Sequence, residues 1–380
     1  MEWCLAIPKI ELHAHLNGSI RDSTLLELAK VLGEKGIIDF ADVEHVIMKK
    51  VRSLTECFRL FDLIHTLTTD HETVTRITKE VVEDFAAENV VYLELRTTPK
   101  KNEAVKMSKR SYMEAVVDGL RAVDAVDVSL ISSYQNPENS RLSPCVNGAC
   151  TGKERRKIHV RLLLSIDRRE TTASAMETVQ LALEMRDLGV VGIDLSGNPV
   201  VGQWQTFVPP LEHAKEQGLR VTLHCGEVPN QKEIQAMLEF HPHRIGHACC
   251  LGEEEWRCLK ASKIPVEICL SSNVMTRSVS SINDHHFVDL YSANHPLLLC
   301  TDDSGVFSTS LTQEYALASS TFGLGKAEMF HLARSAIDFI FAEDCVKTTL
   351  KERFDSASRK FMLQDSIDEA AHGNSSVAHG

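Results

Sequence analysis

The sequence lacks the segments that carry a protein into or across a membrane. No stretch approaches the roughly 18–20 consecutive apolar residues that a bilayer-spanning helix needs. The opening run, MEWCLAIPKIELHAH, shows no basic region followed by an apolar one, which is the pattern of a secretory signal. The eleven cysteines are scattered, without the paired spacings of a disulfide framework. We therefore expect a reduced protein with free thiols in the cytosol.

Positive charge is also scarce, since the formal net charge is -12. Binding to nucleic acid in general, or to a membrane surface, needs a basic footprint, so we expect neither as a partner. A small anionic substrate stays possible because it needs only a few local cations. Hydrophobic residues make up 43% and charged residues 25%, the usual balance of a soluble globular protein. A chain of 380 residues can bury a large core without disulfides.

Short β-rich runs alternate with longer amphipathic helical stretches along the chain. A repeated strand-then-helix order predicts a parallel sheet, and eight such units predict an α/β protein with a closed (β/α)8 TIM barrel. The candidate strands are Ile7–His15, Val90–Thr97, Ile158–Asp167, Val190–Leu195, Leu219–His224, Arg244–His247, Val266–Leu270 and Leu297–Thr301. Helical patterns between them include Val74–Glu88, Ser111–Val126, Thr172–Leu188, Phe207–Gln217 and Lys232–Phe240.

The first crossover is long and contains two further helical patterns, Ser23–Gly33 and Leu54–Leu67. We interpret them as extra helices after the first strand that cap the mouth of the barrel. Residues 129–157 are rich in Ser, Asn, Pro, Gly and charge, which predicts a flexible surface insertion. Residues 366–380 predict a disordered tail. We therefore expect one domain over residues 1–365, acting as a monomer.

The candidate strands share one property at their carboxyl ends, where most of them finish in polar or ionisable residues. These are His13 and His15, Thr97, Asp167, Ser196, His224, His247, Ser271, and Asp302 with Asp303. In (β/α)8 enzymes the active site lies at the carboxyl ends of the strands. The pattern therefore supports the barrel and places its active site at that end.

The first strand ends in Glu11-Leu12-His13-Ala14-His15. Alternate side chains of a strand share a face, so His13 and His15 point the same way and can bind one metal ion. An isolated pair of this kind is often two core histidines that are hydrogen-bonded to their neighbours. Its position at the end of the first barrel strand favours the metal site.

Two further candidate ligands end other strands, His224 the fifth and Asp302 the eighth. Three histidines and one carboxylate, completed by a water, suit a catalytic Zn²⁺ ion, one per chain. Zinc would lower the pKa of that water to near 7. Taken alone, Asp302-Asp303 fits a solvated loop or a helix N-cap equally well.

Attack by such a water also needs groups that move protons. Glu227, three residues after His224, is a candidate acid. His247 ends the sixth strand and could orient or deprotonate the water, although a single histidine there is often structural. Asp303 could accept from a substrate or support its neighbouring ligand. The H-x-E…P-C-x-x-C signature of zinc deaminases that act on cytosine is missing.

At these residues the sequence resembles the adenosine/AMP deaminase family. The similar motifs follow the order of the family from residue 8 to about 305: Pro8–Ser19 (PKIELHAHLNGS), Asp194–Pro199 (DLSGNP), His224–Glu227 (HCGE), Arg244–His247 (RIGH), Ser271–Asn273 (SSN) and Thr301–Asp303 (TDD). The resemblance implies a zinc ion held by His13, His15, His224 and Asp302. It further implies that Glu227 protonates purine N1, that His247 orients the attacking hydroxide, and that the Gly197 N–H faces N3.

Position 17 bears on the substrate. Adenosine deaminases carry Asp there and microbial adenine deaminases Glu, whereas this chain has Asn17. A carboxylate near the ribose would repel a 5′-phosphate and an amide would not. Lys100, Arg168 and Arg169 follow the second and third strands, where cations suit a phosphate, although all three could be solvated surface charges.

These features are similar to the adenosine deaminase-like branch of the family, whose members hydrolyse N6-methyl-AMP to IMP and methylamine. The resemblance implies substrate contacts from His15, Asn17, His65, Thr97, Thr98, Pro99, Lys100, Asp167, Gly197 and Asp303. Two alternatives stay open. One is an adenosine deaminase that turns adenosine into inosine. The other is a nucleoside-binding protein without catalysis, which the presence of Glu227 and all four ligands disfavours.

Overall fold

The computed structural model describes residues 2–49, 52–130 and 156–373. Its parallel strands follow the order β1-β2-β4-β5-β6-β7-β8-β9, and β3 pairs with β4 outside this path. The strands are β1 Lys9–His15, β2 Val90–Thr97, β3 Asp127–Ser129, β4 Lys157–Asp167, β5 Val190–Ser196, β6 Arg220–Cys225, β7 Arg244–His247, β8 Val266–Ile268 and β9 Leu297–Leu299. The eight predicted strands are confirmed to within a few residues, and the (β/α)8 barrel with them.

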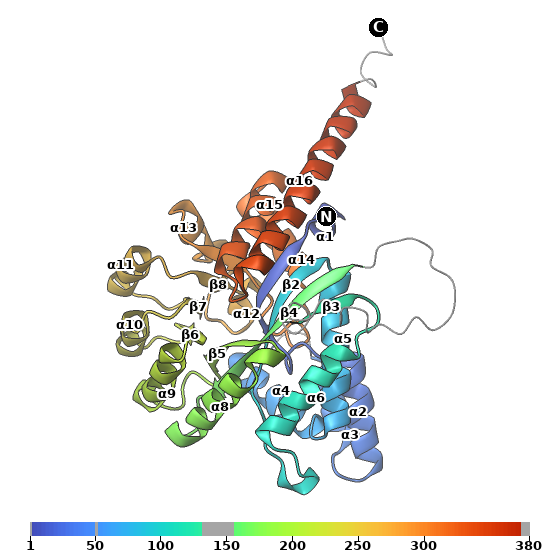
Figure 1. The fold of residues 1–380 in the computed structure, drawn as a ribbon, viewed down its shortest axis with the longest axis vertical. Helices are drawn as coiled ribbons and strands as arrows, with labels where there is room; N and C mark the ends of the chain where they lie inside the picture. The colour runs from blue at the N-terminus through green and yellow to red at the C-terminus, as the bar shows by residue number, and fades with distance from the viewer. Residues whose placement is uncertain (1, 50–51, 131–155, 374–380) are drawn as a thin grey trace, which may run out of the picture.

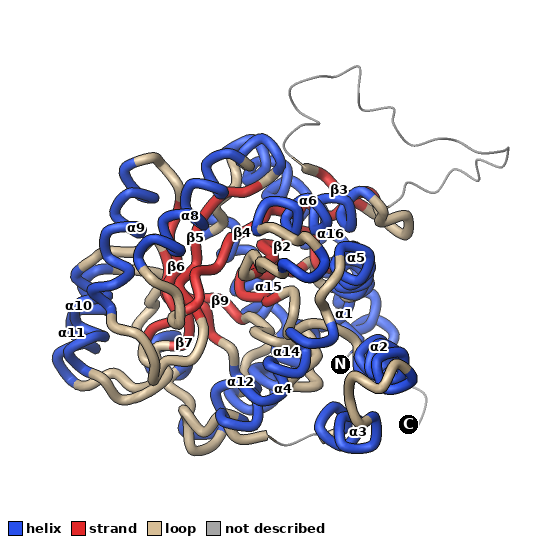
Figure 2. The backbone as a smooth tube through the Cα atoms, turned by 90° about the horizontal axis from the view of Figure 1, so that it is seen from below, coloured by secondary structure: helices blue, strands red, loops and turns tan. Residues whose placement is uncertain are grey.

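The helices surround the sheet on the outside of the barrel (Figures 1 and 2). They are α1 Glu2–Ala6, α2 Asp22–Glu34, α3 Phe40–Met48, α4 Leu54–Leu67, α5 His71–Ala87, α6 Lys109–Arg121, α8 Thr172–Glu184, α9 Trp204–Glu216, α10 Gln231–Glu239, α11 Glu253–Ser262, α12 Leu270–Met275, α13 Phe287–Ser292, α14 Leu311–Phe322, α15 Lys326–Ser335 and α16 Asp344–Gly373. The predicted extra helices of the first crossover correspond to α2 and α4, and α3 lies between them.

The seam between the last strand and the first closes the barrel. Just beyond β9, Asp302 forms a parallel bridge with Ala14 of β1. The His15 N–H donates to the Asp302 carbonyl at 3.0 Å, and the Asp302 N–H donates to the His13 carbonyl at 2.8 Å. The buried Glu11 carboxylate accepts from the backbone and hydroxyl of Thr301, both at 2.9 Å. The residues that join the ends of the barrel therefore include three of the four predicted metal ligands, His13, His15 and Asp302.

The interior of the barrel is charged below the predicted site. Arg96, Arg244 and Glu267 are fully buried. The Arg244 guanidinium binds Glu267 Oε1 at 2.6 Å and Glu94 Oε2 at 2.5 Å, and it stacks on the Phe341 ring at 3.5 Å from the centroid. A buried charge is tolerated only where it is paired and hydrogen-bonded. This network pairs the charges and fixes the carboxylates of Glu267 and Glu94 within the sheet.

The two segments predicted to be flexible lie partly in the described chain. β3 and β4 flank the insertion, and residues 131–155 between them lie outside the described residues. The three-residue β3 was missed because so short a run, beside a polar insertion, gives no alternating pattern. α16 continues to Gly373, so a helix extends into the segment predicted as a disordered tail, and residues 374–380 lie outside the described chain.

All nine cysteines in the described part of the chain are free, as expected. In the same part of the chain, no helix combines the length and the apolar character that crossing a bilayer requires.

Candidate active site

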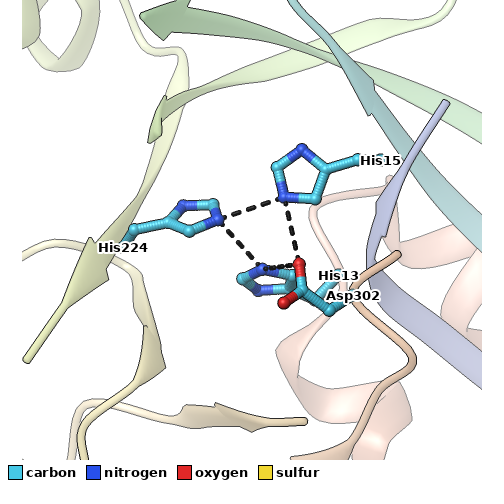
Figure 3. Close-up of side chains that lie close together, drawn as sticks. All are labelled: His13, His15, His224 and Asp302. Atoms are coloured by element: carbon cyan, nitrogen blue, oxygen red, sulfur yellow. Dashed lines mark hydrogen bonds and ion pairs between the residues drawn. The ribbon is translucent and has the colours of Figure 1, made fainter. Parts of the chain in front are cut away.

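The four predicted metal ligands converge at the carboxyl ends of β1 and β6 and just beyond β9 (Figure 3). The Nε2 atom of His224 lies 3.1 Å from Nε2 of both His13 and His15. Asp302 Oδ1 lies 3.4 Å from the same two nitrogens of His13 and His15. One ligand atom from each residue falls within 4.8 Å of all the others. The side chains thus surround a space of the size that one metal ion occupies.

Buried carboxylates fix the protonation of two of these histidines. Nδ1 of His13 lies 2.5 Å from Glu267 Oε2, and Nδ1 of His224 lies 3.0 Å from Asp194 Oδ1. An ionised carboxylate only accepts, so each Nδ1 carries the hydrogen and each Nε2 presents a lone pair. Two lone pairs at 3.1 Å repel each other unless a cation lies between them. The donor set therefore fits a metal, and its carboxylate–histidine arrangement is the usual support of such sites.

The fourth ligand is oriented by a hydroxyl group. Ser272 Oγ donates to Asp302 Oδ2 at 2.6 Å, which leaves Oδ1 directed at the imidazoles. The backbone of Asp302 has a φ of 62°, and His247 has one of 66°. Such left-handed conformations are rare outside glycine and asparagine, and they concentrate at functional sites. Both strand ends are therefore bent to aim a side chain into the barrel mouth.

Glu227 follows β6 and faces this centre. Burial, and to a smaller degree the Asp302 carboxylate, raises the pKa of Glu227 to about 7, although His224 opposes the shift. Its Oε1 lies 3.9 Å from His247 Nε2. A carboxyl group with this pKa is partly protonated at neutral pH, as a general acid must be. The role of Glu227 as the acid stays a prediction.

His247 and Asp303 each present an unsatisfied buried atom near the centre. Among the described residues, neither His247 Nε2 nor Asp303 Oδ1 has a hydrogen-bond partner. Burial, and then the adjacent Asp302, raises the pKa of Asp303 well above its ordinary value. Gly18 makes room for this carboxyl, because a Cβ there would lie 1.6 Å from Asp303 Oδ1. Orphaned buried atoms of this kind suit contacts to a ligand.

A cavity opens from this centre toward α4. Its lining includes eight of the predicted substrate contacts, namely His15, Asn17, His65, Thr97, Thr98, Asp167, Gly197 and Asp303. Pro99 and Lys100 are not among the lining residues. The apolar side of the cavity comes from Phe58, Phe61 and Phe307, which sequence reasoning missed. The helical pattern of α4 placed a helix there but did not indicate which residues face inward.

Lys100 does not line the cavity, but Thr68 links it by hydrogen bonds to Asn17, which does. Lys100 Nζ donates to Thr68 Oγ1 at 3.0 Å, and the Asn17 amide donates to the same oxygen at 3.4 Å. Burial lowers the pKa of Lys100 to about 7. No carboxylate pairs with Lys100 in the described chain, so an anion at this end of the cavity would gain a partly desolvated cation.

The two arginines after the third predicted strand differ in position. Arg168 is buried and binds Glu233 at 2.6 Å, so its charge holds α10 and lies outside the cavity. Arg169 lines the cavity, yet its guanidinium binds both oxygens of Asp167, at 3.0 and 2.7 Å. Of the three predicted cations, only Lys100 is free of a carboxylate partner within the described residues.

Several residues that orient the site were not predicted as site residues. Asp194 and Ser272 lie within the quoted motifs but received no role, whereas Glu267 and Arg96 lie inside strands. Arg96 binds Asp194 at 3.1 Å and Glu267 at 2.9 Å, so it joins the carboxylates that orient His224 and His13. Only the register of β2, β5 and β8 brings these groups together, and no local sequence pattern shows it.

A parallel (β/α)8 barrel whose carboxyl end carries three histidines and a carboxylate is the architecture of a metal-dependent hydrolase. A profile of the adenosine deaminase family matches residues 8–357. The chain is 68% identical to N6-mAMP deaminase from Arabidopsis thaliana over 358 residues, 94% of this chain and 99% of the relative. It is 40% identical to N6-methyl-AMP deaminase from Homo sapiens over 359 residues, 92% of each chain.

A solved structure agrees with this relationship. The crystal structure of Arabidopsis ADAL complexed with IMP has a TM-score of 0.88 and 67% sequence identity, and the match covers 95% of this chain and 99% of that one. The chain therefore belongs to the adenosine deaminase family, which confirms the resemblance drawn from the motifs.

The packing of His13 against β7 generates a prediction. A Cβ added at Gly246 would lie 2.5 Å from His13 Cε1, so Gly246→Ala should push the ring out of the ligand set. We expect metal affinity to fall by about 10- to 100-fold, the cost of disturbing the support of a ligand. Metal content after dialysis against graded chelator measures this.

Gly323→Ala is the matched control for this variant. Gly323 has a φ of 67° and no atom within 4 Å of an added Cβ, so alanine there is strained but reaches no ligand. This control should lose some stability and keep its metal. Equal retention of metal by both variants would show that the His13 ring does not depend on Gly246.

Proposed function

We propose that this protein is a zinc-dependent hydrolytic deaminase that converts N6-methyl-AMP and water to IMP and methylamine, with one zinc ion per chain. The observation that carries the reaction type is the convergence of His13, His15, His224 and Asp302 beside Glu227. The substrate rests on the 68% identity to the Arabidopsis N6-mAMP deaminase and on the neutral amide of Asn17 in the cavity.

Proton donation to the purine falls to Glu227. Zinc, when bound, supplies a water of lowered pKa beside the ring. The carboxyl of Glu227, with its pKa of about 7, donates a proton to purine N1, which makes carbon 6 a better electrophile. Water oxygen then bonds to carbon 6 and loses its two protons: one goes to the methylamino nitrogen as its bond to carbon 6 breaks, and the other restores the Glu227 carboxyl. The products are a 6-oxopurine and methylamine.

Other residues of the cavity hold the reactants in position. Asp303 lines the cavity, and His247 lies beside it with Nε2 3.9 Å from Glu227 Oε1. Asp303 Oδ1 and His247 Nε2 have no partner among the described residues and would contact the water and the ring. Gly197 has a φ of 100° at the end of β5, which turns its backbone toward the cavity, where its N–H would face purine N3. Fixed polar groups of this kind lower the barrier because they are already oriented before the reaction.

The 5′-phosphate is assigned to the end of the cavity near Asn17. An amide at position 17 neither repels a phosphate nor needs a proton. Lys100 is joined to it through Thr68 and brings a positive charge. The Phe58 and Phe61 side chains offer an apolar wall on the same side of the cavity as α4. His65, whose pKa burial lowers to about 3, is a neutral ring there, and its buried Nδ1 has no partner among the residues that the structure describes.

A direct comparison of substrates tests the proposal. Purified zinc-loaded protein is given N6-methyl-AMP, AMP or adenosine at equal concentration, and IMP or inosine is measured by chromatography. We expect kcat/KM to be highest for N6-methyl-AMP. Preference for unphosphorylated adenosine would identify an adenosine deaminase instead, and the absence of any product would point to a nucleoside-binding protein.

Replacing the proposed acid gives a second prediction. Glu227→Gln keeps the shape of the side chain and removes the proton that N1 receives. We expect kcat to fall by about 10²- to 10⁴-fold, the usual contribution of a general acid, while zinc content stays at one ion per chain. Steady-state kinetics and metal analysis on the same sample measure both. Near-normal kcat would place the acid elsewhere.

The pKa of Lys100 gives a third prediction. Burial lowers it to about 7, so the charge is present below that pH and is lost as pH rises through it. We expect kcat/KM for N6-methyl-AMP to fall over this range and to fall less in Lys100→Arg, which stays charged. Lys100→Ala should raise KM for the nucleotide more than for the nucleoside.

Lys101→Ala is the control for the Lys100 variants. Lys101 is two-thirds exposed and pairs with Glu103 at 3.4 Å, away from Thr68. It should behave as wild type with both substrates. Identical losses with nucleotide and nucleoside in Lys100→Ala would remove Lys100 from the phosphate site.

A further inference from the structure

His247 is attached to a chain of buried hydrogen bonds that starts at a backbone amide. The Phe287 N–H donates to His285 Nδ1 at 3.1 Å, His285 Nε2 lies 3.2 Å from Asn273 Oδ1, and Asn273 Nδ2 lies 3.0 Å from His247 Nδ1. His285, Asn273 and His247 are each at most 2% exposed. The chain connects the start of α13, through α12, to the end of β7, and its side chains are shielded from bulk solvent.

The starting point of this chain sets its direction. A backbone N–H can only donate, so Nδ1 of His285 must accept. Burial, and then the neighbouring His286, lowers the pKa of His285 to about 3, so this ring is neutral and carries its single hydrogen on Nε2. That hydrogen requires an acceptor, which fixes the Asn273 oxygen toward His285 and its NH₂ toward His247.

The hydrogen-bond chain continues into the active site. Because the Asn273 NH₂ donates, His247 Nδ1 must accept, and the hydrogen of this ring lies on Nε2. Nε2 is the buried atom that has no partner in the described chain. The backbone carbonyl of His247 accepts from His286 Nε2 at 2.7 Å, and His286 stacks on His285 with 4.4 Å between centroids. The ring of His247 is thus held from both its side chain and its backbone.

We infer that Asn273 and His285 are positioning residues that hold His247 as the Nε2–H tautomer. His247 then donates a hydrogen bond to the oxygen of the attacking water and does not remove a proton from it. Sequence reasoning left these two roles open. The identity of the recipient rests on the proposed function, whereas the tautomer rests on the hydrogen-bond chain alone.

The assignment also excludes a second grouping of potential ligands. His247, Cys269 and Asp302 offer atoms within 4.8 Å of one another. With Nδ1 engaged by Asn273 and Nε2 carrying a hydrogen, His247 has no lone pair to give a metal. Asp302 therefore serves the centre of His13, His15 and His224 only.

Nuclear magnetic resonance reads the tautomer directly. Zinc-loaded protein labelled with ¹⁵N-histidine, without substrate, gives the protonation of each ring nitrogen, and the His247 signals are those lost in His247→Gln. We expect Nε2–H in the wild type. In Asn273→Asp the new carboxylate can only accept, so the hydrogen should move to Nδ1. A wild-type ring with its hydrogen on Nδ1, or on both nitrogens, overturns the inference.

Kinetics of the same variants test the consequence. Asn273→Asp should lower kcat by on the order of 100-fold, as loss of one oriented donor does, with little change in KM and with zinc retained. His285→Phe frees the Asn273 amide and should lower kcat in the same sense, and it serves if Asn273→Asp fails to fold. His295→Phe removes another buried imidazole, whose Nε2 binds the Ile264 carbonyl at 2.8 Å, and should leave kcat unchanged.

The outcomes separate this inference from the proposed function. Protein that shows Nε2–H on His247 but turns over no purine supports the hydrogen-bond chain and overturns only the function. Protein that deaminates N6-methyl-AMP with Nδ1–H on His247 overturns the inference and leaves the function standing. Unchanged kcat in both Asn273→Asp and His285→Phe, with zinc bound, also overturns it.

Discussion

The contact of Arg96 with two buried carboxylates supports the metal ligands at the mouth of the barrel, because these carboxylates orient His224 and His13. Its guanidinium lies 3.1 Å from Asp194 and 2.9 Å from Glu267, and all three side chains are fully buried. Without this charge Asp194 would lose its guanidinium partner and Glu267 would keep only Arg244, so both buried carboxylates would be less favoured as anions. Their hold on the Nδ1 hydrogens of His224 and His13 would weaken with them. The lone pairs that suit a metal therefore depend on a cation that never touches it.

Much of the fold and of the ligand set could be predicted because both depend on local patterns. Buried strands at regular intervals give the barrel, and the position of His13, His15, His224 and Asp302 at strand ends gives the centre. Charges inside the strands could not be predicted in this way. Glu267 contacts His13, which is 254 residues away in the sequence. The partner of a glutamate on β8 can be identified only once the arrangement of the strands in the barrel is known.

For other residues the sequence predicts the element on which they lie but not the direction in which the side chain points. Arg168 and Arg169 are neighbours in sequence, yet the buried Arg168 side chain turns away from the cavity to Glu233, whereas Arg169 lines the cavity. Phe58 and Phe61 lie on a helix that was predicted, but the face presented to the cavity depends on how α4 packs. The tautomer of His247 depends on an amide that lies forty residues further along the chain, at Phe287. Such information exists only in three dimensions.

The seam of the barrel carries one more consequence. The backbone bridge between Ala14 and Asp302, with the bonds from His15 and to His13, is at once the closure of the sheet and the mounting of three metal ligands. A substitution that disturbs the backbone at this joint would therefore affect both the closure of the sheet and the positions of the metal ligands. β1 and β9 stand at opposite ends of the strand order, so backbone hydrogen bonds, and no connecting loop, hold both the closed sheet and its reactive centre at this joint.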